Sequence, residues 1–390
     1  MLQRALISIF TLLSFVGCKS ASNSGTQPID GPAAWKVDMH QMSASLANLL
    51  PLSADPLQFN NPSNQPQIEQ EIARLAHFSH AIGQMKDKPA ADPSMEFMAK
   101  EFNAEMTEAQ RQLRLGNRSY SRFLIRNATN YCISCHTQTN RGPQFNLATN
   151  PFVARMTPLE RANYLFAVRG FDQGLKEFEA AMQGPDVALL PYASVEEVTL
   201  KALAVAVRVK QDPRMAEQIV ERILHSKWAP VYLQLSAVGW KSSIQDWRKA
   251  PKGKTLTDAR ALLTKGWSRQ VELPMSRAGL IEFLRASVLL HDLLDKKTGD
   301  KSYAEILYSA GLASEALKEL DLYSLSGFYF ENCIRKAPHT MTSRSCYVRL
   351  ETVELSNYAA FDGVGVPSHV RERLDQLRSL ALPIGKSWVE

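Results

Sequence analysis

No part of this sequence alternates apolar and polar residues in the way that predicts a β-strand, so we expect an all-α protein. Long apolar stretches are also missing after the first 17 residues, and the mature chain is therefore not expected to span a membrane. The net charge is +6, but no basic run contains interleaved aromatic residues, so nucleic-acid binding is not expected. A mildly basic surface instead favours an acidic protein partner or anionic lipid.

Recognisable catalytic motifs are absent from the last two-thirds of the chain. Residues 157–390 contain no Ser/His/Asp constellation, no phosphate-binding loop and no cluster of metal ligands. We therefore expect no enzymatic activity from that region.

The N-terminus has the pattern of an export signal. Arg4 precedes a short apolar stretch, which is too short to cross a bilayer and is typical of a signal peptide. The stretch ends in Phe15-Val16-Gly17-Cys18, which resembles the lipobox of bacterial lipoproteins, with Phe15 in place of the usual leucine. That resemblance implies residues 1–17 as a lipoprotein signal peptide, a lipid on Cys18 and a periplasmic protein anchored to a membrane. Lys19-Ser20 lacks the aspartate that often marks inner-membrane retention, which favours the outer membrane. The alternative is a soluble exported protein that loses Cys18 with its signal.

A polar segment separates this signal from the first helical pattern. Residues 18–33 are rich in Ser, Asn, Gly, Gln and Pro, and cannot bury enough apolar surface to order themselves. We expect a flexible tether there.

One short motif carries specific chemistry. Tyr131-Cys132-Ile133-Ser134-Cys135-His136 contains C-x-x-C-H, the attachment signature of c-type haem. Two thiols at this spacing add to the two vinyl groups on one edge of a porphyrin, and the adjacent imidazole of His136 is then the proximal iron ligand. A thioredoxin-like redox pair would need a βαβ context, and a zinc site would need further nearby Cys or His ligands. Neither accompanies the motif, so we expect one covalent haem c.

The position of the motif supports a particular architecture. Four helical patterns precede or contain it, at about residues 35–50, 68–82, 95–113 and 120–138, with Pro51 ending the first and a Pro- and Asn-rich loop following to Pro66. The motif lies at the end of the fourth, whereas typical electron-transfer cytochrome c domains carry it near the start. In this respect residues 34–140 resemble cytochrome c′ and the cytochromes c-556. The resemblance implies an antiparallel four-helix bundle holding the haem.

The same resemblance implies a role for the first helix, which would face the other side of the haem. Low-spin members place a methionine there, and five-coordinate members place a bulky apolar residue. Met39 and Met42 both lie on the apolar stripe of this helix, so Met42, or else Met39, is the candidate sixth ligand. The alternative is that both pack the core, as methionines commonly do. His40 lies off the stripe, and His77 and His80 are expected in solvent.

The remaining chain is expected to be helical throughout. Residues 141–156 form a predicted linker, and Thr157-Pro158-Leu159-Glu160 is a capping box with proline at the first helical position. Another helix start is expected at residues 194–197. Two segments, 170–181 and 304–320, resemble tetratricopeptide hairpins, so residues 157–390 are expected to form a TPR-like, α-solenoid-like domain, with an irregular bundle as the alternative.

Two cysteines remain in this region. Cys333 and Cys346 flank a proline-containing break between two helical patterns, and disulfides persist in exported proteins. We expect a disulfide between them.

These features favour electron transfer by an exported monohaem cytochrome with a redox partner protein. The first alternative is a five-coordinate haem that binds NO or CO. The second is a scaffold whose helical domain binds a protein partner while the haem is ancillary.

Overall fold

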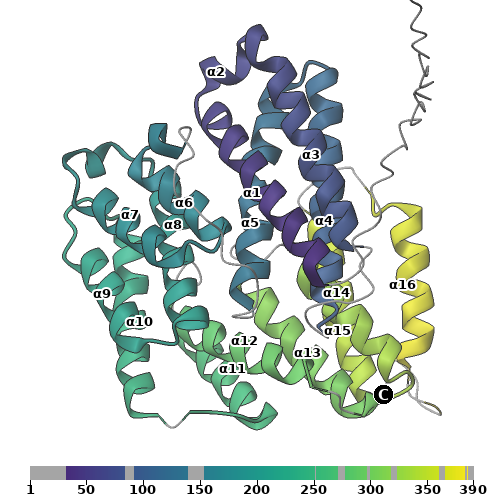
Figure 1. Cartoon of the computed structure of the whole chain (residues 1–390). Coiled ribbons are helices and arrows are strands. Elements are labelled where there is room, and N and C mark those ends of the chain that lie inside the picture. Colours follow the sequence, from purple (N-terminus) through teal and green to yellow (C-terminus); the bar gives the residue numbers. More distant parts are fainter. Residues whose placement is uncertain are drawn as a thin grey trace, which may run out of the picture.

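The computed structural model describes residues 32–83, 92–138, 153–250, 252–270, 277–296, 299–317, 323–359, 365–382 and 384. Every regular element in these residues is helical and none is a strand, which confirms the all-α prediction (Figure 1). Over the same ranges, no helix combines the length and apolar character needed to cross a membrane. The predicted signal peptide, Cys18 and all but the last two residues of the predicted tether lie outside the described residues.

Four long helices form the N-terminal part of the molecule, residues 32–138. They are α1 (Pro32–Ala54), α3 (Gln65–Gly83), α4 (Ser94–Arg114) and α5 (Arg118–Gln138). Each packs against the next, and α1 also contacts α5, so the four helices surround a shared apolar core (Figure 1). Their bounds agree with the four predicted patterns to within a few residues, except at the ends of α1.

The connection between α1 and α3 differs from the prediction. Pro51 was expected to end the first helix, but α1 continues through it to Ala54. A proline near a helix end removes one backbone hydrogen bond only, and Arg122 compensates by donating to the carbonyl oxygens of Ser53 at 2.6 Å and Ala54 at 3.0 Å. The beginning of α1 also lies two residues inside the predicted tether, at Pro32.

The loop expected up to Pro66 is also mostly helical. It contains α2 (Pro56–Asn60) and a 3-10 turn, η1 (Pro62–Asn64). Asp55 and Asn61 cap these elements by accepting hydrogen bonds from the backbone of Leu57 and Ser63. In both cases proline follows the cap at the first helical position, where its missing N–H costs nothing.

The larger C-terminal part of the molecule, residues 153–382, consists of further helices, most of them shorter. They are η2 (Val153–Arg155), α6 (Pro158–Ala167), α7 (Phe171–Gln183), η3 (Pro185–Leu189), α8 (Tyr192–Ala204), the π-helical turn η4 (Val205–Val209), α9 (Pro213–Leu224), α10 (Val231–Lys249), α11 (Leu256–Gln270), α12 (Leu280–Leu294), α13 (Asp300–Ala316), α14 (Tyr323–Lys336), α15 (Met341–Ala359) and α16 (Ser368–Ala381). The capping box at Thr157 and Glu160 begins α6 as predicted. The start expected at Ser194 was wrong by two residues, because α8 begins at Tyr192 directly after Pro191.

Successive helices in the C-terminal part pack as hairpins through small residues. A Cβ on Gly174 of α7 would lie 2.7 Å from the ring of Phe166 on α6, and one on Gly311 of α13 would meet the ring of Phe330 on α14. These contacts require glycine because no side chain fits between the paired helices. Further along, Cys333 of α14 and Cys346 of α15 form a disulfide, with their Cα atoms 6.3 Å apart.

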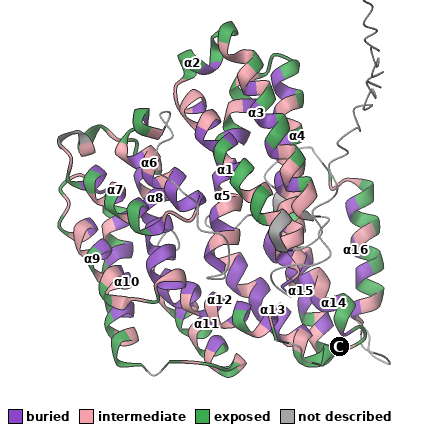
Figure 2. Ribbon diagram, viewed as in Figure 1, coloured by how far each residue is buried: buried purple, intermediate pink, exposed green. Residues whose placement is uncertain are grey.

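The N-terminal and C-terminal parts pack directly against each other. The rings of Phe97 on α4 and Phe328 on α14 stack with their centroids 4.4 Å apart. Met98 and Ile133, from α4 and α5, belong to the same apolar core as the later helices. Within that core α8 and α12 are largely buried (Figure 2). The end of α5 therefore lies between these two parts rather than at an outer surface.

Candidate haem site

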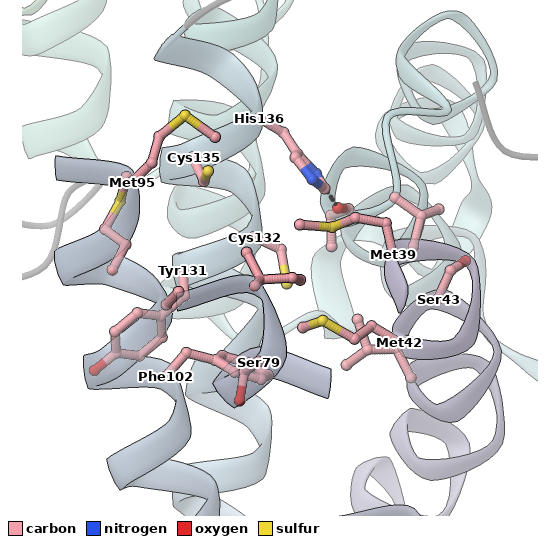
Figure 3. A pocket seen from close by; sticks show the side chains of 16 residues that line it. Met39, Met42, Ser43, Ser79, Met95, Phe102, Tyr131, Cys132, Cys135 and His136 are labelled. Carbon is pink, nitrogen blue, oxygen red and sulfur yellow. Dashed lines mark hydrogen bonds between the residues drawn. The ribbon is translucent and has the colours of Figure 1, made fainter. Parts of the chain in front are cut away.

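The end of α5 opens onto an apolar pocket between α1, α3, α4 and the turn after α6 (Figure 3). The space between its walls, with the open solvent at its mouth included, is about 610 Å³. The lining residues are Met39, Met42, Ser43, Leu46, Ser79, Ile82, Met95, Met98, Ala99, Phe102, Tyr131, Cys132, Cys135, His136, Ala167 and Val168.

The three residues of the haem motif reach this pocket together. Cys132, Cys135 and His136 are three and four residues apart on α5, the spacing that places side chains on one helix face. Both cysteines are free thiols and half-buried. The helix thus presents two thiols and one imidazole to a single apolar space.

His136 is held by a residue from the C-terminal part of the chain. Its Nδ1 lies 2.6 Å from the backbone carbonyl oxygen of Ala167, at the end of α6. A carbonyl oxygen only accepts hydrogen bonds, so Nδ1 carries the proton and Nε2 carries the lone pair that coordinates a metal. This arrangement is the usual support for a ligating histidine, because it fixes both the tautomer and the ring orientation.

Two arginines fix the backbone and helix end around His136. Arg169 donates from Nη1 to the carbonyl oxygen of His136 at 3.2 Å, from a left-handed backbone conformation with φ 62°. Arg208, in the π-helical turn η4, is buried and donates to Thr137 Oγ1 at 3.3 Å and to Ser287 Oγ at 2.9 Å. Cations at a helix C-terminus interact favourably with its dipole. The motif is therefore anchored from α6, η4 and α12 at once.

Burial sets the protonation of the motif. It raises the pKa of Cys132 and of Cys135 to about 12, with the neighbouring Cys135 adding to the effect at Cys132 and Lys201 opposing it. Reactive redox cysteines have thiol pKa values lowered to about 3.5–7.5, so this pair does not have the character of a thioredoxin-like site. Burial, followed by the positive charge of Arg169, lowers the pKa of His136 to about 4, although the hydrogen bond to Ala167 opposes this. The imidazole is therefore neutral, as a metal ligand requires.

The predicted methionines both line the pocket. Figure 3 shows Met39 and Met42 reaching in from α1, across from Cys132 and His136. Met42 is buried and Met39 half-buried, so Met42 is the better shielded of the two. Met95 and Met98 of α4 also line the pocket. The sequence placed these two on an apolar stripe but gave no sign that they would face the motif.

The other histidines of the N-terminal part lie away from this pocket. His40, His77 and His80 are exposed, in agreement with the prediction for His77 and His80. None of them lines the pocket.

The residues present fit a c-type haem better than a bare metal ion. Within the described ranges, no three His, Cys, Asp or Glu side chains lie close enough together to hold a metal ion. A haem iron needs only one or two protein ligands, because the porphyrin supplies the others. The two thiols, the neutral imidazole and the apolar walls meet the requirements of an attached porphyrin.

Comparison with models of protein families, with curated proteins and with solved structures gave no match to this chain. The resemblance to cytochrome c′ and the cytochromes c-556 therefore depends on the motif and the helical pattern alone.

Proposed function

We propose that this chain is an exported, lipid-anchored monohaem c-type cytochrome that transfers electrons in the periplasm. The observation that supports this best is the meeting of Cys132, Cys135 and a neutral, carbonyl-anchored His136 at one apolar pocket. When bound there, a haem supplies an iron that cycles between the ferric and ferrous states.

In this proposal, several residues of the chain have separate roles at the haem. Cys132 and Cys135 would hold the porphyrin covalently, and His136, with its imidazole fixed by Ala167, would be the proximal ligand. Met42, or else Met39, is the sixth ligand from the opposite wall. The apolar walls exclude water and keep the ligands in place, so that little reorganisation accompanies electron transfer. Burial and a thioether ligand both favour the reduced state and raise the reduction potential.

The C-terminal part of the chain has two roles in this proposal. Ala167, Val168 and Arg169 contact the haem site directly, so the helical region contributes to the site itself. Its helical hairpins, such as the one containing Gly174, support a TPR-like or α-solenoid-like surface that docks a redox partner protein. A lipid on Cys18 would confine both proteins to one membrane surface, the outer membrane being favoured, and raise their effective concentration.

The test is an optical and electrochemical study of the full chain, purified from a bacterial host that attaches haem c. We expect low-spin spectra in both oxidation states and a single one-electron transition. A high-spin ferrous form that binds CO rapidly would contradict electron transfer with a methionine ligand and favour the gas-binding alternative.

A further inference from the structure

A second pocket lies beside the π-helical turn η4, which also supplies Arg208 to the end of α5. Helices α10, α11 and α12, the turn after η4 and the loop between α10 and α11 form its walls, and its empty space with the open mouth is about 1300 Å³. The residues that matter below are Val207, Trp247, Lys252, Asp258, Lys265 and Arg285.

Arg285 is the most distinctive residue of this pocket. It is half-buried, and its guanidinium lies over the ring of Trp247, 5.2 Å from the centroid. Among the arginines of the described ranges that are not exposed, every other one hydrogen-bonds or pairs with a protein group. Arg285 has no such partner, although a half-buried guanidinium carries five donors that need acceptors.

The two carboxylates whose charges act on Arg285, Glu282 and Asp246, both pair with other cations. Glu282 pairs with Arg269 at 2.9 Å and accepts from Ser243 Oγ at 2.8 Å. Asp246 pairs with Lys265 at 2.6 Å and with Arg269 at 2.7 Å. Arg285 therefore lines the pocket without a hydrogen-bond acceptor among the described residues.

The rest of the lining favours a ligand that is negative at one end and apolar at the other. Lys252 adds positive charge to the pocket, whereas the charge of Lys265 is paired with Asp246. The single acid of the described lining, Asp258, is engaged at one oxygen by Thr255 Oγ1 and by the backbone N–H groups of Lys254 and Thr255. Apolar side chains make up most of the remaining wall: Val207, Ala261, Leu262, Val288 and Leu289.

The backbone next to this pocket departs from regular geometry at two places. Val207 belongs to the π-helical turn η4, and Gln211 has a left-handed φ of 49°. π-helical turns and left-handed non-glycine residues cost free energy and occur often at binding sites. Both features here belong to residues that line the pocket.

We propose that this pocket binds a small organic anion, a carboxylate or phosphate monoester attached to an apolar or aromatic body. Arg285 receives the oxyanion in a bidentate hydrogen-bonded pair, as guanidinium groups do with carboxylates and phosphates. Lys252 contributes long-range attraction, and Val207 and Leu289 contact the apolar body. This site is separate from the haem site and does not depend on the proposed electron transfer.

The test is isothermal titration calorimetry of the full chain as purified, with benzoate and phenyl phosphate as the two anionic probes and benzyl alcohol as the uncharged control. We expect at least one anion to bind one-to-one with a Kd of about 1 mM or tighter. Arg285→Gln should weaken it about tenfold or more, since the hydrogen bonds to a charged group are lost. Arg260→Gln removes an exposed arginine of α11 outside the pocket and should leave the affinity unchanged.

Three results would overturn the proposal: neither anion binds the wild-type chain, benzyl alcohol binds as tightly as benzoate, or Arg285→Gln binds like the wild type. If Arg285→Gln does not fold, Lys252→Gln replaces it, because this exposed residue is not needed for packing. That variant should weaken binding about threefold, as expected for a charge at the rim of a site. Unchanged affinity in Lys252→Gln at low salt would then contradict the proposal.

Discussion

His136 Nδ1 lies 2.6 Å from the backbone carbonyl oxygen of Ala167, 31 residues further along the chain. One residue belongs to the haem motif at the end of α5, and the other ends α6, the first α-helix of the C-terminal part. This contact explains why residues after 157 are part of the site. A chain cut before α6 would lose the acceptor that fixes the proximal imidazole.

Arg169 should raise the reduction potential of the site. Its positive charge next to His136 favours the reduced state, so Arg169→Asn is expected to lower the potential. A unit charge within about 10 Å at an effective dielectric of about 20 is worth on the order of 1–2 kcal/mol, or ~40–90 mV for one electron. Asparagine tolerates the left-handed backbone at this position. Spectroelectrochemical titration measures the shift, and Arg222→Asn, which removes an arginine paired with Glu179, is the control. An equal shift in both variants would contradict a specific role for Arg169.

The sixth ligand can be identified by substitutions that keep side-chain volume. Met→Leu changes in a core usually cost less than about 1.5 kcal/mol, so the fold is preserved. Met42→Leu, or else Met39→Leu, should abolish the weak sulfur-to-iron charge-transfer band at the red end of the ferric spectrum. Met95→Leu, on α4, is the matched control and should keep the band. Loss of the band only in Met95→Leu would assign the ligand to α4 and contradict the α1 prediction.

Asp92 should make stability depend on acid pH. It is buried and accepts a hydrogen bond from His291 Nδ1 at 2.6 Å, which joins the start of α4 to α12. Burial alone would raise the pKa of Asp92, but the hydrogen bonds from His291 and Ser94 hold it below its usual range. A carboxylate with a lowered folded-state pKa stabilises the fold above its unfolded pKa, and this stabilisation is lost as the pH falls through the folded value.

The matching experiment compares the wild type with Asp92→Asn in guanidinium unfolding. At pH 7 the variant should be less stable by ~3 kcal/mol, since one partner of a buried pair is removed. The difference should begin to shrink below about pH 4, where the unfolded chain takes up a proton at this carboxyl, and should be smallest below the lowered folded-state pKa of Asp92. A difference that stays constant between pH 7 and pH 3 would show that the Asp92 charge does not stabilise the fold.

Several helix starts were readable from the sequence because side chains make the caps. Thr157 and Glu160 form the predicted capping box, and the same logic at Asp55-Pro56 and Asn61-Pro62 would have identified α2 and η1. The error at Pro51 has a different cause. That helix continues because Arg122, far along the chain, caps its last carbonyl groups, and no local pattern encodes such a contact.

The site shows the same division between local and distant information. The motif Cys132, Cys135 and His136 is local and could be read directly. Its support could not, because Ala167 acts through a backbone carbonyl that every residue possesses. Arg208 likewise comes from a π-helical turn with no sequence signature. Met95 lines the pocket with the motif because of how α4 packs. The apolar pattern of a single helix does not determine that packing.

The disulfide between Cys333 and Cys346 should stabilise the C-terminal part of the chain. It closes a short loop, with a sequence separation of 13 residues, for which a contribution of about 3 kcal/mol is expected. Replacing both cysteines by alanine should lower the free energy of unfolding by that order, while the haem spectrum stays unchanged. Mass spectrometry of the oxidised, unfolded wild type should find neither thiol free. Two alkylatable thiols there, or an unchanged stability of the double variant, would contradict the prediction.

The most direct measurement is the mass of the denatured full chain, purified from a bacterial host that attaches haem c. If the account is correct, the wild-type chain carries one haem that survives acid-acetone extraction and denaturing electrophoresis. Replacing Cys132 or Cys135 alone by alanine should weaken the attachment, and replacing both should abolish it. A wild-type chain without covalent haem, or a double variant with full covalent haem, would contradict the central claim that these two thiols hold the cofactor.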